Sequence, residues 1–223
     1  MELLLGNLNY SSWSIRAALV ARASGLDIPE RIVPLGFEES RAFLIKETGM
    51  HTVPVLRVGD LIIRDSLAIT EWIAEKAAPG RVWPKDEGRR ALARSVCAEM
   101  HSSFTGLRSQ MPVNIRTRSE TPPLEGDLLV NIERVKAIWT KLRADHHREG
   151  DFLFGGWSAA DAFYAPVVTR FRTYGYALEG VLAEYLDAVW EHELLQTLRA
   201  EAESEPWEIE MGFLGPVRAW VRD

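Results

Sequence analysis

Three serines, Ser11, Ser12 and Ser14, stand within four residues where a short apolar strand is expected to turn into a helix. The first N–H groups of a helix have no partner within it, and the helix dipole adds partial positive charge there. Hydroxyl groups at such a helix start can hold an anion, such as a thiolate or a carboxylate. The alternative is that one serine only caps the helix, because serine is a common N-cap residue. The cluster alone leaves both interpretations open.

The elements that must position these serines alternate between strands and helices over about the first eighty residues. We expect strands at 2–6, 30–35, 53–58 and 61–64, and helices from the serines to about 24, over 38–47 and over 65–78. The first strand, helix and strand form a parallel unit, whereas the last two strands form an antiparallel hairpin. The parallel unit places the serines at the carboxyl edge of the sheet, where open α/β sheets bind ligands. This element order is typical of a thioredoxin-like domain.

The second part of the chain carries helical spacing only. A segment rich in proline and glycine interrupts the pattern, and we expect a thioredoxin-like domain at 1–78, a linker at 79–87 and an all-α domain at 88–223. Helices are expected over 89–111, 124–148, 158–174 and 181–203. The predicted fold class is therefore an α/β thioredoxin-like domain followed by an all-helical domain.

Composition excludes several classes of function. With 223 residues and a formal net charge of −6, the chain lacks the basic character of a general nucleic-acid-binding protein. The single cysteine, Cys97, excludes an intramolecular disulfide and a cysteine-based zinc site, and we expect a small buried side chain there. The adjacent His146 and His147 are interpreted as surface residues, so no metal is predicted. The apolar run at 1–6 is too short for a signal sequence or a membrane span, which predicts a cytoplasmic protein that does not bind membranes.

Three separated motifs resemble those of the cytosolic glutathione transferase family, and together they cover essentially the whole chain. The first, Ser-Ser-Trp-Ser-Ile-Arg at 11–16, is similar to the Ser-Ser-Cys-Ser-Trp-Arg signature of the zeta class, which includes maleylacetoacetate isomerase. Trp13 stands where that class has a cysteine, which weakens any transfer of zeta-class isomerase chemistry to this chain. The resemblance is to a serine-type, bacterial subgroup, and it implies the glutathione transferase fold.

The second motif comprises His-Thr-Val-Pro-Val-Leu at 51–56 and Asp-Ser at 65–66. The resemblance implies a cis peptide bond before Pro54, and backbone hydrogen bonds between Val53 and the cysteinyl part of glutathione. Asp65 can then bind the γ-glutamyl ammonium group, while Ser66 and its helix start take the neighbouring carboxylate. The implied glutathione-binding residues are Trp13, Thr52, Val53, Pro54, Asp65 and Ser66.

The third motif, Gly-Trp-Ser-Ala-Ala-Asp at 156–161, resembles the capping box of the family's helical domain. Ser158 can accept a hydrogen bond from the backbone N–H three residues on, while Asp161 reaches back to the N–H of Ser158. We interpret both residues as structural, and Asp161 is not expected to act as a base.

Catalysis in this family requires the glutathione thiol to be ionised. A hydroxyl that donates to the thiolate contributes roughly 1.5–3 kcal/mol, or about one to two units in the thiol pKa. Ser11 matches the family's catalytic serine best, and Ser12 is the second candidate. Tyr10 is ranked below both, although other classes of the family use a tyrosine.

The electrophile is expected between the two domains, against the first long helix after the linker. Cys97, His101, Phe104, Arg108 and Met111 follow at helical spacing and form one stripe, which suits a pocket wall or a dimer interface equally. Arg170 and Arg172 would favour an anionic electrophile if either faces the cleft. The residues expected to line the pocket are Tyr10, Met100, His101, Phe104, Arg108, Met111, Arg170 and Arg172.

The function predicted from these features is that of a glutathione S-transferase acting on a small electrophile, with glutathione as co-substrate. One alternative is glutathione-dependent cis/trans isomerisation, and another is a binding module that keeps the fold without turnover. The resemblance also implies a homodimer. The aromatic run at 207–220 is expected to fold back over the helical domain and could close the pocket.

Overall fold

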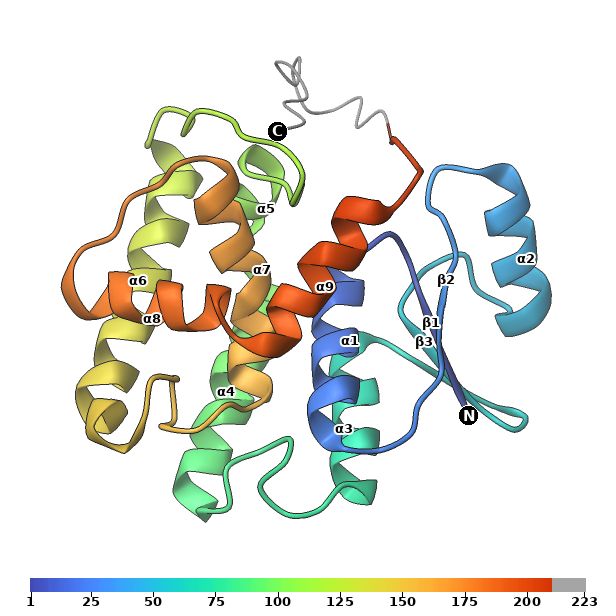
Figure 1. The fold of residues 1–223 in the computed structure, drawn as a ribbon, viewed down its shortest axis with the longest axis horizontal. Helices are drawn as coiled ribbons and strands as arrows, with labels where there is room; N and C mark the ends of the chain where they lie inside the picture. The colour runs from blue at the N-terminus through green and yellow to red at the C-terminus, as the bar shows by residue number, and fades with distance from the viewer. Residues whose placement is uncertain (210–223) are drawn as a thin grey trace.

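The computed structural model describes residues 1–209, and it divides them between a small sheet with three helices and a larger helical array (Figure 1). The sheet contains β1 (Glu2–Leu5), β2 (Glu30–Ile32), β3 (Val55–Val58) and β4 (Leu61–Arg64) in the order β2-β1-β3-β4. β1 and β2 are parallel, and β1–β3 and β3–β4 are antiparallel. This is the predicted thioredoxin-like arrangement, with the serine-bearing turn after β1 at the carboxyl edge of that strand.

Three helices complete this part: α1 (Ser12–Ser24), α2 (Glu38–Thr48) and α3 (Ser66–Lys76). Gly25 and Gly49 end α1 and α2 in the left-handed conformation, as expected for glycine after a helix. The strands β2 and β3 are shorter than predicted. For β3 the reason is Pro54, which has no N–H to donate to the ladder, so that the strand begins only at Val55.

The helical part contains α4 (Glu87–Ser102), α5 (Thr105–Gln110), α6 (Gly126–His146), the 3₁₀ turn η1 (His147–Glu149), α7 (Ala159–Thr173), α8 (Gly180–Trp190) and α9 (Glu193–Ser204). Two expected helices are each broken in two. The helix predicted over 89–111 stops before Phe104, whose backbone has a φ of 64° and cannot continue a right-handed helix. The helix predicted over 181–203 is interrupted before His192, which caps α9 by accepting a hydrogen bond from the N–H of Leu194 at 3.3 Å.

α1 lies at the junction of the two parts, where it packs against α3 on one side and α7 on the other. Figure 1 shows α9 crossing the molecule beside α1 and ending near the point where β1 leads into it. Trp139 on α6 packs edge-on against Tyr164 and Phe171 of α7 and against Tyr185 of α8, and all four side chains are buried. The serine-bearing helix is therefore held by both parts of the fold.

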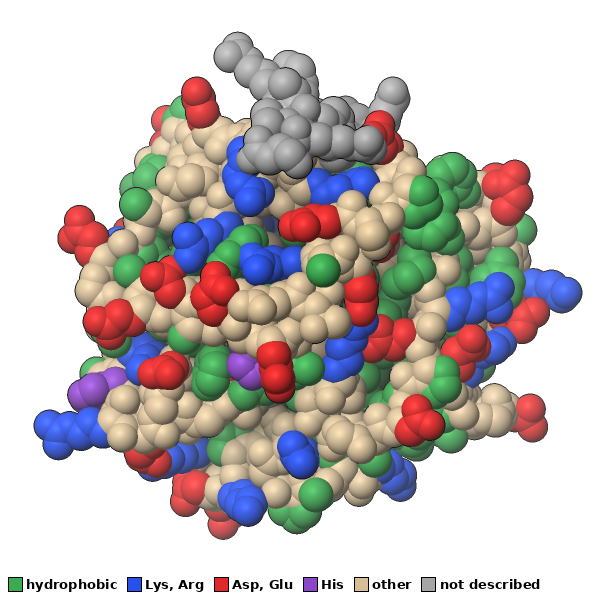
Figure 2. Space-filling model, in the orientation of Figure 1, with side chains coloured by type: hydrophobic (Ala, Val, Ile, Leu, Met, Phe, Trp, Pro, Cys, Tyr) green, Lys and Arg blue, Asp and Glu red, His purple; other side chains and the backbone are tan. Residues whose placement is uncertain are grey.

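The surface carries both signs of charge. Figure 2 shows Lys and Arg side chains interspersed with Asp and Glu on the face it presents. Within residues 1–209, no helix is long and apolar enough to cross a membrane. The predicted return of the 207–220 run over the helical domain lies mostly outside the described residues.

Candidate functional site

A cleft of about 420 Å³ opens beside the start of α1, between the β3–β4 hairpin and α3. All six residues that the sequence motifs predicted for ligand binding line it, together with two residues that the sequence analysis did not select. The lining residues are Trp13, Met50, Thr52, Val53, Pro54, Arg64, Asp65 and Ser66. The Val53–Pro54 peptide bond is cis, as the resemblance implied.

Asp65 has an unusual backbone and two partners. Its φ of 76° is rare for a residue with a side chain, and such outliers persist where the surrounding structure holds them, often at binding sites. One carboxylate oxygen accepts a hydrogen bond from the N–H of Leu67 at 2.8 Å and so caps α3. The other lies 3.2 Å from Nε2 of His101 on α4. Because the carboxylate remains partly exposed at the cleft, it can also accept from an ammonium group.

Ser66 begins α3 and lines the same cleft with no partner for its hydroxyl. The residue is fully buried, and its Oγ makes no hydrogen bond within the described part of the chain. An unsatisfied buried hydroxyl is costly, so a ligand atom that bonds to it would stabilise the site. Arg64, just before Asp65, adds a guanidinium group to the wall. The cleft therefore offers an acid for an ammonium group and a hydroxyl with a guanidinium for a carboxylate.

The serine cluster occupies the start of α1, and its three members have different partners. Ser14 is fully buried, and its Oγ accepts from the N–H of Gly6 at 2.8 Å, which ties the helix to the end of β1. Ser11 is the N-cap, and its Oγ accepts from the N–H of Ser14 at 3.2 Å. The Ser11 hydroxyl proton thus stays available for donation, since the oxygen acts only as acceptor there. Ser12 is the first residue of α1, directly after this cap.

Neither Ser11 nor Ser12 lines the cleft itself, although Trp13 does. Both serines are 7% exposed. Tyr10 faces another direction, because its hydroxyl accepts from Arg116 at 3.2 Å and from the N–H of Ile209 at 3.4 Å. The structure thus places Tyr10 against the segments around 116 and 209 and not among the residues that line the cleft.

Trp13 is surrounded on its helical side by positive and aromatic groups. The guanidinium carbons of Arg16 and Arg108 lie 4.7 and 5.1 Å from its ring centre, and the His101 ring meets it edge-on at 5.1 Å. Arg16 is fully buried, and none of its three guanidinium nitrogens has a hydrogen-bond partner in the described chain. Burial lowers the pKa of Arg16, and the charges of Arg108 and Arg170 lower it further.

The two neighbouring arginines are bonded to backbone carbonyl groups and not to acids. Arg108 donates to the carbonyls of Ser103, at 3.0 Å, and Met100. Arg170 donates to those of Met111 at 2.7 Å and Pro166 at 3.0 Å, and burial lowers its pKa to about 9. The region behind Trp13 therefore concentrates positive charge.

Several residues predicted for the electrophile pocket lie elsewhere. Met100, Phe104 and Met111 are buried in the core, so they do not line the cleft. The predicted stripe is also divided, because the chain turns at Phe104 between α4 and α5. Arg172 is not among the residues that line the cleft: it pairs with Asp187, and its guanidinium lies 5.4 Å from the ring centre of Trp190 on α8.

Ser158 and Asp161 form the capping box of α7. Asp161 accepts hydrogen bonds from the N–H groups of Ser158 at 2.9 Å and Leu153 at 3.0 Å, and from the hydroxyl of Tyr185 at 3.2 Å. Its complete burial raises its pKa to about 6 despite these donors. Every contact is internal to the helical part, which fits a structural role.

Cys97 is buried, and desolvation raises its pKa well above that of a free thiol. A buried thiol that does not ionise is a poor nucleophile. Within residues 1–209, no group of three or more His, Cys, Asp and Glu side chains is arranged to hold a metal ion.

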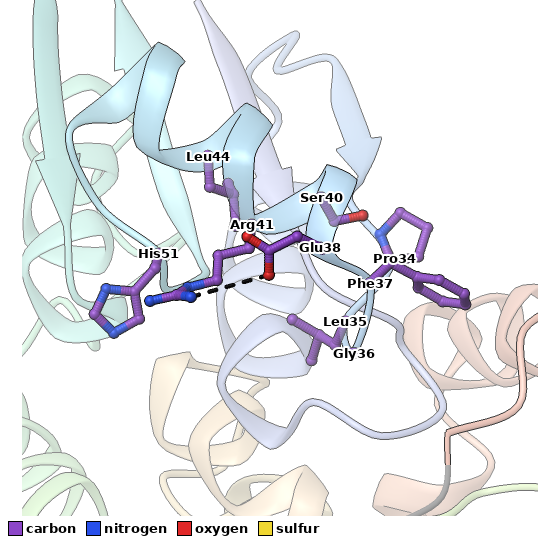
Figure 3. Close-up of a pocket in the computed structure, with 9 residues that line it drawn as sticks. All are labelled: Pro34, Leu35, Gly36, Phe37, Glu38, Ser40, Arg41, Leu44 and His51. Atoms are coloured by element: carbon purple, nitrogen blue, oxygen red, sulfur yellow. Dashed lines mark ion pairs between the residues drawn. The ribbon is translucent and has the colours of Figure 1, made fainter.

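A second cleft of about 280 Å³ is formed by the loop before α2, by α2 itself and by His51 in the turn that follows it. Figure 3 shows the Arg41 guanidinium extending between His51 and the Glu38 carboxylate, to which it is paired at 3.9 Å. His51 lines this cleft, whereas its neighbours Met50 and Thr52 line the larger one. The segment at 50–52 therefore forms a wall shared by both.

Comparison with known proteins finds a family model that matches the first part of the chain. Residues 5–81 match the family model described as glutathione S-transferase, N-terminal domain. Glutathione S-transferase 1 of Dianthus caryophyllus is 37% identical over 116 residues, which is 51% of each chain. A probable maleylacetoacetate isomerase of Caenorhabditis elegans is 28% identical over 109 residues, 49% of this chain and 50% of that protein. The match thus spans about half the length of these curated relatives.

Solved structures extend the likeness to nearly the whole chain. A glutathione transferase homolog from Burkholderia, solved with bound glutathione, superposes with a TM-score of 0.67 over 92% of this chain and 98% of that one, at 22% identity. At this identity the likeness shows the fold, which is the predicted thioredoxin-like domain followed by a helical domain.

Proposed function

We propose that this chain is a glutathione S-transferase, because residues 5–81 match the family model of the glutathione S-transferase N-terminal domain and the chain superposes over 92% of its length on a glutathione transferase homolog. It would bind glutathione as co-substrate and activate the thiol as a thiolate for attack on a small electrophile. The observation that carries this proposal is the Asp65–Ser66 pair in the cleft, where an exposed acid adjoins an unsatisfied buried hydroxyl.

The cleft suits the γ-glutamyl end of glutathione, which carries an ammonium group next to a carboxylate. Asp65 would accept from the ammonium group, and Ser66 would donate to the carboxylate at the start of α3. Arg64 adds a positive charge for the same carboxylate. The backbone of Val53, whose peptide bond to Pro54 is cis, would form hydrogen bonds with the cysteinyl part of glutathione, next to Thr52. Trp13, in the first turn of α1, forms the remaining wall of the cleft.

Ser11 or Ser12 would donate the hydrogen bond that stabilises the thiolate. Ser11 keeps its proton free while its oxygen caps α1, and Ser12 is the first residue of the same helix. The dipole of α1 adds partial positive charge at this point. A shift of one to two units places the thiol pKa near 7, so that roughly half of the thiol would be ionised at neutral pH.

The positive groups behind Trp13 support an anionic electrophile. Within residues 1–209, Arg16, Arg108 and Arg170 have no carboxylate partner, and the Arg16 guanidinium has no hydrogen bond. A carboxylate or similar group on the electrophile would supply the missing negative charge. His101, between Trp13 and Asp65, would lie at the boundary of the two substrates.

Glutathione-dependent cis/trans isomerisation is the second candidate. The probable maleylacetoacetate isomerase relative and the serine motif favour it, whereas Trp13 in place of the zeta-class cysteine does not. A binding module without turnover is the third candidate. It would retain the cleft but would not lower the pKa of the bound thiol.

We place the protein in the cytoplasm as a homodimer, on its likeness to the family alone. The proposed domains are 1–78 and 88–223, joined by a linker at 79–87. The end of α3 at Lys76 and the start of α4 at Glu87 support a boundary close to these limits.

The test compares conjugation of glutathione to a neutral nitroaryl halide and to its carboxylate-bearing analogue. We expect turnover of both, with Arg108→Gln lowering kcat/KM for the carboxylate analogue by roughly tenfold, since one charge-assisted contact is lost. The neutral compound should change less than twofold. Arg148→Gln, at an exposed arginine, is the matched control. Binding of glutathione without conjugation or isomerisation of any compound would favour the non-catalytic module.

A further inference from the structure

The turn that leads into the serine helix is held from the far end of the described chain. The carboxylate of Glu205 accepts a hydrogen bond from the N–H of Leu8 at 2.6 Å and another from the N–H of Asn9 at 3.3 Å. Glu205 is only 8% exposed, and 197 residues separate it from Leu8. Two backbone donors directed at one buried carboxylate are charge-assisted bonds, which are stronger than those between neutral groups.

The same turn carries Ser11. The carbonyl of Asn7 accepts from the N–H groups of Tyr10 at 3.2 Å and Ser11 at 2.8 Å, which closes the turn immediately before α1. Leu8 and Asn9, the residues bonded to Glu205, are the two residues within it. A change in their position would therefore move the N-cap hydroxyl.

Further contacts hold Asn9 and the Glu205 backbone to the segment around 115. The fully buried side chain of Asn9 donates to Oδ1 of Asn114 and accepts from the N–H of Arg116, both at 3.0 Å. The Arg116 guanidinium donates to the carbonyl of Glu205 at 2.7 Å. The turn, the 114–116 segment and Glu205 thus form one network.

α9 brings Glu205 to this position. It packs along α1, and Glu201 within it pairs with Arg22 in the last turn of α1 at 2.6 Å. Glu205 directly follows α9 and contacts the turn before the other end of α1. The end of α9 and Glu205 therefore contact residues near both ends of α1, beside which α9 crosses in Figure 1.

We infer that Glu205 is a positioning residue that fixes the serine-bearing turn and so sets where the Ser11 hydroxyl meets the thiol. The thiol part of this inference rests on the proposed function. The carboxylate acts through the backbone of Leu8 and Asn9 and does not touch the substrate. Its role differs from that of Asp161, whose bonds lie within the helical part.

The test uses Glu205→Gln in the full chain, with Glu208→Gln as the control, because Glu208 is exposed and its substitution makes the same change in charge. A glutamine at 205 turns one of its two acceptors into an amide N–H₂, so one backbone donor loses its partner. We expect the Leu8 and Asn9 amides of Glu205→Gln to exchange hydrogen roughly tenfold faster. We also expect the thiol pKa of bound glutathione to rise by about half a unit to one unit. Glu208→Gln should match the wild type in both measurements.

Glu205→Asp keeps the charge but shortens the side chain. Its amide exchange rates and its thiol pKa should therefore lie between those of the wild type and those of Glu205→Gln. Unchanged exchange in Glu205→Gln would overturn the inference. Faster exchange with an unchanged thiol pKa would also overturn it, because Glu205 would then only stabilise the fold. If the wild type itself leaves the thiol pKa unshifted, the proposed function fails and the thiol part of the inference fails with it. Amide exchange then still decides whether Glu205 holds the turn.

Discussion

The two sides of Trp13 are built in different ways. On the side of the sheet, the cleft is formed by short stretches of sequence, and its polar groups belong to helix starts and strand ends. On the helical side, Arg16, Arg108 and Arg170 come from three separate helices, and most of their partners are backbone carbonyls and aromatic rings. The first side is positioned by backbone geometry and the second by side-chain packing.

This difference has a functional consequence. A site fixed by backbone geometry suits a constant ligand, because its donors and acceptors change little when side chains are exchanged. A site made of packed side chains can change its specificity through single substitutions. Under the proposed function, the cleft would recognise glutathione and the region behind Trp13 would select the electrophile.

Asp65→Asn gives the sharpest test of the cleft. Asparagine is as good an N-cap as aspartate, so α3 should keep its start and the free energy of unfolding should change by less than about 0.5 kcal/mol. The loss of one negative charge facing an ammonium group should weaken glutathione binding by roughly tenfold or more. Isothermal titration calorimetry measures this affinity, with Asp60→Asn in the exposed hairpin turn as control. Equal affinities for the two variants would remove Asp65 from the site.

Arg16→Leu tests the helical side of Trp13. Its expected effect is smaller, and it is a gain in stability where Asp65→Asn causes a loss of binding. A buried cation without hydrogen-bond partners destabilises the fold, so its replacement by an apolar side chain should raise the free energy of unfolding by about 1–2 kcal/mol. The same change should lower turnover of anionic electrophiles and spare neutral ones. Urea denaturation gives the stability. A loss of stability would mean that stacking of the guanidinium between Trp13 and Phe163 outweighs the cost of its burial.

The sequence predicted the cleft better than the region behind it, for a physical reason. The cis bond at Pro54 and the α3 start at Asp65 depend on neighbouring residues, so contiguous motifs carry them. Phe104 could not be predicted as a helix break, because phenylalanine has no preference for positive φ. Without that break, Phe104 and Met111 were placed on one stripe with His101.

The remaining site residues show the same limit. Arg64 and Met50 adjoin predicted residues, and the position of Arg64 directly before the Asp-Ser pair was the available signal. Arg16 was part of a motif, but its complete burial follows from the packing of α1 against α7. The bond between Glu205 and Leu8 joins residues so distant in sequence that no local pattern indicates it.

The central claim is that a serine at the start of α1 activates the thiol of glutathione bound in the cleft. The most direct measurement is the ultraviolet absorbance of the thiolate in the bound complex from pH 5 to 9, for the wild type, Ser11→Ala and Ser12→Ala. We expect the wild type to lower the thiol pKa, and Ser11→Ala to raise it again by about one to two units, with a smaller effect of Ser12→Ala. A larger effect of Ser12→Ala would transfer the role to that serine. An unshifted thiol in all three proteins would contradict the claim and leave a binding module with a transferase fold.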